Sequence, residues 1–87
     1  MSSTLTTLMV LYVKTGCPWC RAAEEYLDKR GYKYKQVDVR RDPAAFNELK
    51  RISGQTYAPT LVIGNLFLPD FGPDELEEFL KEHNILP

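Results

Sequence analysis

The only two cysteines of the chain lie three positions apart in the motif CPWC, at the junction of two different sequence patterns. The residues Thr7–Val13 before the motif are nearly all apolar, which predicts a short strand buried on both faces. From Pro18 onward, apolar residues recur at helical spacing. Proline suits the first turn of a helix, and Gly31 supplies a stop. The pattern therefore places Cys17 at the N-terminus of a helix that follows a buried strand.

This first predicted helix has a definite apolar side. The stripe consists of Trp19, Ala22, Ala23, Tyr26 and Leu27. Cys20, Ala23 and Leu27 lie along its flank, so the second cysteine points toward the buried side one turn inside the helix.

The middle of the chain predicts a second strand and a second helix. Tyr32–Val39 alternates imperfectly between polar and apolar residues, as a strand that runs parallel to the first after a helical crossover would. Asp42 is placed as a helix N-cap and Pro43 at the first helical position. The apolar positions of this helix are Ala45, Leu49 and Ile52.

The end of the chain predicts a hairpin and a third helix. Gly64-Asn65 is a two-residue turn signal between Thr60–Ile63 and Leu66–Leu68, so these strands should pair antiparallel. Pro73–His83 has helical spacing, with Asp74 in its first turn. The prediction is one α/β domain over residues 1–87, a four-stranded mixed sheet flanked by three helices in the order β-α-β-α-β-β-α.

Composition and charge exclude several classes of function. Eleven basic and twelve acidic residues give a net charge of −1, and their scatter along the chain argues against a nucleic-acid partner. The apolar run before CPWC is too short for a bilayer span or a signal peptide, and no basic segment precedes it. We expect a cytoplasmic monomer that does not bind a membrane.

Three kinds of chemistry use paired cysteines. A structural disulfide is uncommon in the cytoplasm, and one that closes so short a loop constrains the unfolded chain only weakly. Tetrahedral zinc needs four ligands, whereas the chain offers two cysteines and the distant His83. No metal site within one chain is expected, although a half-site shared between two chains stays open.

Redox exchange explains more of the pattern. A thiol at a helix N-terminus faces free backbone N–H groups and the positive end of the helix dipole, which favours the thiolate, and the ammonium of Lys14 adds to this. We expect Cys17 to be the attacking thiolate and Cys20 the resolving thiol, as in thiol–disulfide exchange.

Two segments resemble the glutaredoxin family. YVKTGCPWC is similar to its active-site segment, and TYAPTLVIGN is similar to the segment in which a cis-proline precedes the third strand. The resemblance covers about residues 8–83 and implies the thioredoxin fold. It also implies that Pro59 is cis beside the cysteines, that the backbone of Ala58 pairs with an extended substrate, and that Lys14 helps to hold glutathione.

The end of the chain resembles a related group. Glutaredoxins have a glycine pair where this chain has Pro69-Asp70, and FGPDEL resembles the NrdH-type redoxins, which thioredoxin reductase reduces. The resemblance implies a dithiol oxidoreductase that reduces disulfide-containing proteins or small disulfides and is recharged by glutathione, with no bound cofactor. Thioredoxin reductase is the alternative electron donor.

Further residues are candidates for the binding surface. Trp19 and Tyr57 offer aromatic area near the thiols, and Asp70 and Asp74 carry carboxylates that suit the ammonium of a γ-glutamyl group.

Two other functions stay open. One is a module that holds a metal or an iron–sulfur cluster between two chains. The other is a protein-binding adaptor in which the thiols are incidental.

Overall fold

A four-stranded mixed sheet forms the centre of the protein. The structure is a computed structural model that describes residues 8–87. Its strands are β1 (Met9–Val13), β2 (Lys35–Asp38), β3 (Thr60–Ile63) and β4 (Leu66–Pro69), in the spatial order β2-β1-β3-β4. β1 pairs parallel with β2 and antiparallel with β3, which pairs antiparallel with β4.

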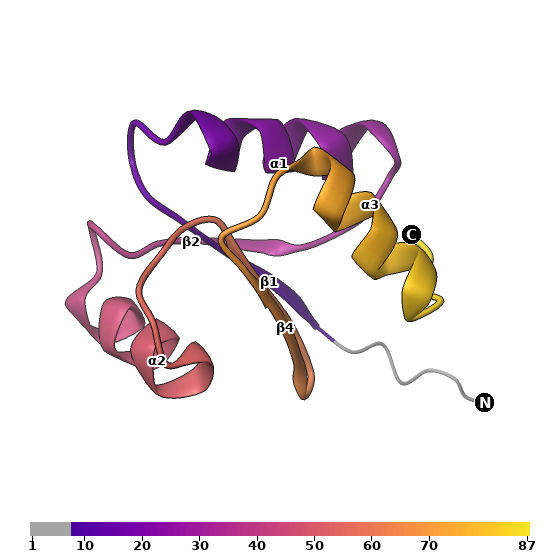
Figure 1. Cartoon of the computed structure of the whole chain (residues 1–87). Helices are drawn as coiled ribbons and strands as arrows, with labels where there is room; N and C mark the ends of the chain where they lie inside the picture. The colour runs from indigo at the N-terminus through magenta and orange to yellow at the C-terminus, as the bar shows by residue number, and fades with distance from the viewer. Residues whose placement is uncertain (1–7) are drawn as a thin grey trace.

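Three helices cover the two faces of the sheet. They are α1 (Pro18–Lys29), α2 (Pro43–Ser53) and α3 (Pro73–Glu82). α1 and α3 lie together on one face and α2 lies on the other (Figure 1). The predicted element order and the mixed sheet are confirmed.

The alternation of side chains along β1 divides the core into two parts. Leu11 and Val13 point to the side of α1 and α3, where they pack with Leu27, Leu61 and Leu76 among others. On the other side, the cluster consists of Tyr12, Val39, Leu49 and Val62. A fully buried leucine contributes roughly 1.5–3 kcal/mol to the free energy of unfolding. Packing on both faces of β1 therefore stabilises its position in the sheet.

The predicted strand Tyr32–Val39 is wrong in its first three residues and in its last, since β2 begins at Lys35 and ends at Asp38. Tyr32 instead closes the end of α1, because its N–H donates to the carbonyl of Leu27 at 3.0 Å, and its hydroxyl donates to the carbonyl of Ile85 at 2.6 Å. These contacts hold the segment before β2 away from the sheet. The predicted first strand begins at Thr7, which lies outside the described residues, and β1 itself begins at Met9.

The predicted apolar stripe of α1 is rotated from the side that the structure buries. Cys20, Ala23 and Leu27 are buried, whereas Trp19 is 61% exposed. The helix packs on the sheet along the flank that contains the second cysteine. At the end of α3, His83 is an exposed cap and belongs to no buried stripe.

Candidate functional site

Cys17 is the N-cap residue of α1. Its backbone is extended (φ −94°, ψ 110°), and its Sγ accepts a hydrogen bond from the backbone N–H of Cys20 at 3.2 Å. The N–H of Cys17 donates to the carbonyl of Lys14 at 3.2 Å, which fixes the turn before the helix. The sulfur that would attack a disulfide therefore sits at the positive end of the helix dipole, as the sequence predicts.

Cys20 lies behind Cys17 in the core. Its side chain is 2% exposed, and both cysteines are free thiols. Burial, followed by the hydrogen bond with Cys17, raises the pKa of the Cys20 thiol to about 12. The pair therefore consists of a half-buried thiol at the surface and a buried one that stays protonated.

The segment before β3 forms the other wall of the site. The Ala58–Pro59 peptide bond is cis, as the resemblance implies, and the carbonyl of Ala58 lies 3.9 Å from Cys17 Sγ. Thr60 is fully buried, and its hydroxyl donates to the carbonyl of Tyr57 at 2.7 Å. This bond holds the turn in place while the Tyr57 side chain is 62% exposed.

The turn before CPWC is attached to the end of β2. The hydroxyl of Thr15 donates to the carboxylate of Asp38, which also accepts from the N–H of Arg40 at 2.9 Å. The hydrogen bond from Thr15 is the main reason that the pKa of Asp38 is lowered. Sequence reasoning missed this attachment, although Asp38 is the next-to-last residue of a strand predicted to run parallel to the one before the motif, so the two strand ends meet.

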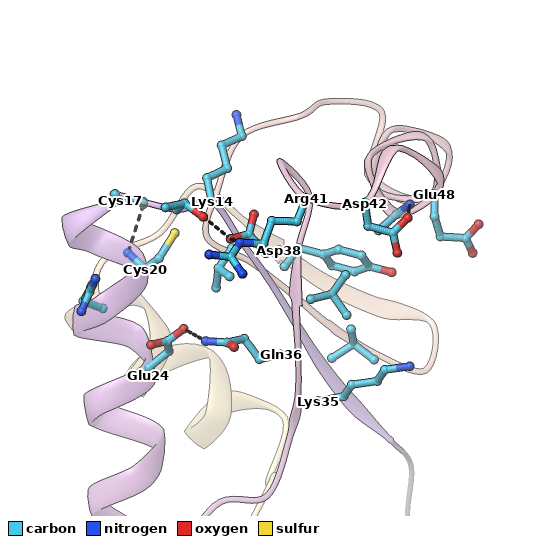
Figure 2. Close-up of a pocket in the computed structure, with 18 of the residues that line it drawn as sticks. Lys14, Cys17, Cys20, Glu24, Lys35, Gln36, Asp38, Arg41, Asp42 and Glu48 are labelled. Carbon is cyan, nitrogen blue, oxygen red and sulfur yellow. Dashed lines mark hydrogen bonds and ion pairs between the residues drawn. The ribbon is translucent and has the colours of Figure 1, made fainter.

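An open groove of about 860 Å³ runs from the two cysteines along β2 toward α2. Lys14 lines it together with Cys17 and Cys20, so the structure brings these three predicted residues together. Figure 2 shows Asp38 and Arg41 beyond them on the β2 side. Acidic and basic side chains both line the groove, so its charge is mixed.

Trp19 and Asp70 lie at a smaller pocket that borders the start of α3. Its other lining residues are Phe71, Gly72 and Glu75. The backbone N–H of Asp70 donates to the carbonyl of Pro59 at 2.8 Å, so the segment before α3 is joined to the cis-proline. Asp74 is exposed in the first turn of α3 and lines neither pocket.

Neither a metal cluster nor a bilayer span is found in the part of the chain that the structure describes. No three His, Cys, Asp or Glu side chains among residues 8–87 are placed to hold a metal ion. None of the described helices is long and apolar enough to cross a bilayer.

A capping thiol, a buried partner thiol and a cis-proline, set on a four-stranded sheet with helices on both faces, define a small domain of the thioredoxin-like fold. The family model described as Glutaredoxin matches residues 9–68. The chain therefore belongs to the glutaredoxin family.

Relatives agree with this assignment. The chain is 29% identical over 66 residues to the glutaredoxin-like protein NrdH of Escherichia coli, which covers 76% of this chain and 80% of that protein. It is 24% identical over 75 residues to a glutaredoxin-like 8.6 kDa protein of Clostridium pasteurianum, over 86% of this chain and all of that protein. The crystal structure of the thioredoxin-like protein BC3987 superposes with a TM-score of 0.76 at 29% identity, over 83% of this chain and 99% of that one.

Proposed function

We infer that the protein is a dithiol thiol–disulfide oxidoreductase, with Cys17 as nucleophile and Cys20 as resolving thiol. The observation that carries this proposal is the position of the two thiols. Cys17 Sγ caps α1 and accepts from the N–H of Cys20 at 3.2 Å, while the Cys20 side chain is buried directly behind it. One thiol is accessible to a substrate, and the other is kept protonated until the first has reacted.

The proposed reaction has two steps. The Cys17 thiolate attacks a substrate disulfide, forms a mixed disulfide and expels one substrate sulfur as a thiolate. Cys20 then loses its proton and attacks Cys17 Sγ, which breaks the bond to the remaining substrate sulfur. The substrate leaves with two electrons more, and the protein holds a disulfide between Cys17 and Cys20.

The substrates proposed here are disulfide-containing proteins and small disulfides. The carbonyl of Ala58, 3.9 Å from Cys17 Sγ, is available to pair with the backbone of an extended substrate beside the disulfide. The exposed rings of Trp19 and Tyr57 provide apolar contact area near the thiols. A substrate bound in this way would present its disulfide to Cys17.

Glutathione is the proposed electron donor. Lys14 lines the groove beside both cysteines, where its ammonium suits a carboxylate of the tripeptide. The carboxylates of Asp70 and Asp74 are proposed to bind the γ-glutamyl ammonium. Asp70 has the better placement, since its backbone is hydrogen-bonded to Pro59.

Thioredoxin reductase is a second candidate donor, which two specific observations favour. Asp70 occupies the left-handed region at φ 49°, a backbone conformation that suits glycine better, in the place where glutaredoxins have a glycine pair. In addition, a structure of NrdH-redoxin from Escherichia coli, 27% identical with a TM-score of 0.67 over 80% of this chain and 91% of that one, is described as having a thioredoxin-like activity profile.

Two parallel assays separate the donors. The oxidised protein is mixed with NADPH, glutathione and glutathione reductase in one, and with NADPH and thioredoxin reductase in the other. The glutathione proposal predicts NADPH consumption in the first assay, and turnover in the second assay alone would replace it with the reductase.

Cysteine variants test the oxidoreductase proposal itself. Cys17→Ser should abolish turnover in both assays, and Cys20→Ser should stop a protein disulfide at the mixed disulfide. Full activity of the double variant would overturn the proposal.

A further inference from the structure

The resolving step needs an acceptor for the proton of Cys20. The thiol is buried with a raised pKa, yet only its thiolate can attack the mixed disulfide. Two of the causes that raise this pKa, a hydrogen bond and a charge, come from Cys17. They disappear once Cys17 is bonded to the substrate, so burial and the charge of Glu24 remain. The proton must still leave through a path that the fold provides.

The groove beside β2 provides this path. Cys20 lines the groove although it is almost fully buried. Glu24 lines the same groove from the next turn of α1, because residues four apart lie on one side of a helix. In Figure 2 the side chains of Cys20 and Glu24 both extend from α1 toward β2. A carboxylate thus stands one helical turn from the thiol, at the opening that joins it to solvent.

The other carboxylates of the groove are engaged elsewhere. Asp38 accepts from Thr15 and from the N–H of Arg40. Asp42 accepts from two N–H groups at the start of α2, and Glu48 pairs with Arg51. The carboxylate of Glu24 instead accepts from a neutral amide, since Gln36 Nε2 donates to its Oε2. Glu24 is therefore held in position by β2, and among residues 8–87 it forms no ion pair that would oppose proton uptake.

Several charged groups lie near this pair. The pKa of Cys20 is raised by Cys17 at the cap and by Glu24 on its own helix, and it is lowered by a backbone hydrogen bond at Lys14, whose side chain lines the same groove. Arg21 and Asp28 lie one turn away from Glu24 on α1. The phenol of Tyr34, in the segment before β2, donates to Asp28 at 3.0 Å. Burial, this hydrogen bond and the charges of Asp28 and Glu24 raise its pKa to about 12. Lys35, Asp38 and Arg41 line the same groove further along β2. When Glu24 takes up a proton, the negative charge that opposes a Cys20 thiolate is removed.

We propose that Glu24 accepts the proton of Cys20, through water in the groove, as Cys20 attacks the mixed disulfide, and that Gln36 positions the carboxylate. The Cys20 S–H bond breaks and its proton moves to the carboxylate. A bond forms between Cys20 Sγ and Cys17 Sγ, and the bond from Cys17 Sγ to the substrate sulfur breaks. The substrate departs as a thiolate and takes a proton from Glu24 or solvent. This inference rests on the proposed dithiol function.

A single-turnover experiment separates the two steps. The reduced protein is mixed with one equivalent of 4,4′-dithiodipyridine, which releases one thiopyridone when Cys17 attacks and a second when Cys20 resolves. Absorbance follows both releases from about pH 6 to about pH 8. Native protein should give two equivalents, and Cys20→Ser should give one. Failure of the native protein to give the second equivalent would refute the dithiol function, whatever the role of Glu24.

Glu24→Gln is the decisive variant. The first release should keep its native rate, and an unchanged circular dichroism spectrum shows that the variant is folded. The second release should be slower than in the native protein by roughly 100-fold near pH 7, which is the lower end of the range for a positioned proton acceptor. Its rate should also increase about tenfold per pH unit, more steeply than in the native protein, because solvent has to take the proton.

The direction of the change in the second-release rate distinguishes a proton acceptor from a purely electrostatic role. If Glu24 only opposed the thiolate by its charge, its removal would make the second release faster. A second release in Glu24→Gln that is as fast as in native protein, or faster, would overturn the proposal.

Glu25→Gln is the matched control, because it makes the same charge change at an exposed neighbouring residue that does not line the groove. Both steps of this control should match the native protein. Gln36→Ala should slow the second release and leave the first unchanged.

Discussion

The hydroxyl of Thr15 donates a hydrogen bond to the carboxylate of Asp38, so the turn that precedes CPWC is attached to the end of β2. Arg40 strengthens the attachment from the other side, since its guanidinium donates to the carbonyl of Thr15 at 3.3 Å. The parallel pairing of β1 and β2 brings these residues together across 23 positions of sequence. The turn before Cys17 is therefore attached to a carboxylate whose pKa this hydrogen bond lowers.

Asp38 should make the free energy of unfolding fall as pH is lowered into the acid range. Its pKa in the folded chain lies below the ordinary aspartate value of 3.8, so the unfolded chain binds the proton first as pH falls. The stabilisation is fully present above pH 3.8 and is lost as pH falls through the folded-state pKa. Asp38→Asn should reduce the fall in unfolding free energy between about pH 7 and about pH 3, measured by urea denaturation. An unchanged fall would contradict this prediction, and the exposed Glu82→Gln serves as control.

Thr60→Val should destabilise the protein and disturb the wall of the site. The hydroxyl is buried and supplies a hydrogen bond to the carbonyl of Tyr57. Removing it leaves that carbonyl without this donor, which costs about 1–3 kcal/mol of unfolding free energy. Thr60→Ser keeps the hydroxyl and should retain most of the binding of a peptide disulfide. Equal peptide affinity in Thr60→Val and the native protein would show that this hydrogen bond does not position the segment.

The sequence predicts the elements whose signals are local. Asp42 is found as an N-cap because its carboxylate accepts from two N–H groups only two and three residues ahead. Gly64-Asn65 connects β3 and β4 as the turn signal indicates. Cys17 is placed at the start of α1 because a strand pattern and a helix pattern meet beside it. Each of these features depends on neighbours within a few residues.

Features that depend on distant contacts could not be predicted in this way. Tyr32 is drawn out of the expected strand by the carbonyl of Ile85, 53 positions away. Trp19 fits the helical stripe by spacing, yet the sheet buries the neighbouring flank and leaves the ring beside Gly72. The attachment of Thr15 to Asp38 likewise requires the register of two strands. Periodicity defines a side of a helix but not the neighbour that covers it.

Gly72→Ala should move Trp19 without straining the backbone. The backbone of Gly72 has φ −106°, which any residue adopts, but an added Cβ would lie 3.3 Å from Cζ3 of the Trp19 ring. The ring is mostly exposed and can shift outward. Because Trp19 is the only tryptophan, its fluorescence should shift toward that of a solvated indole, while the unfolding free energy changes by less than about 1 kcal/mol. An unchanged spectrum would mean that the ring does not rest on Gly72.

The two thiols should differ widely in their reaction with iodoacetamide. Only a thiolate is alkylated readily, and burial followed by the hydrogen bond with Cys17 raises the pKa of Cys20 to about 12. Below that pH the thiol stays protonated, and its 2% exposure also excludes the reagent. Mass spectrometry of the folded protein labelled at about pH 8 should find the label on Cys17 alone, whereas protein unfolded in urea should be labelled at both positions. Equal labelling of both cysteines in the folded protein would contradict the burial of Cys20 and remove the need for a proton acceptor in the resolving step.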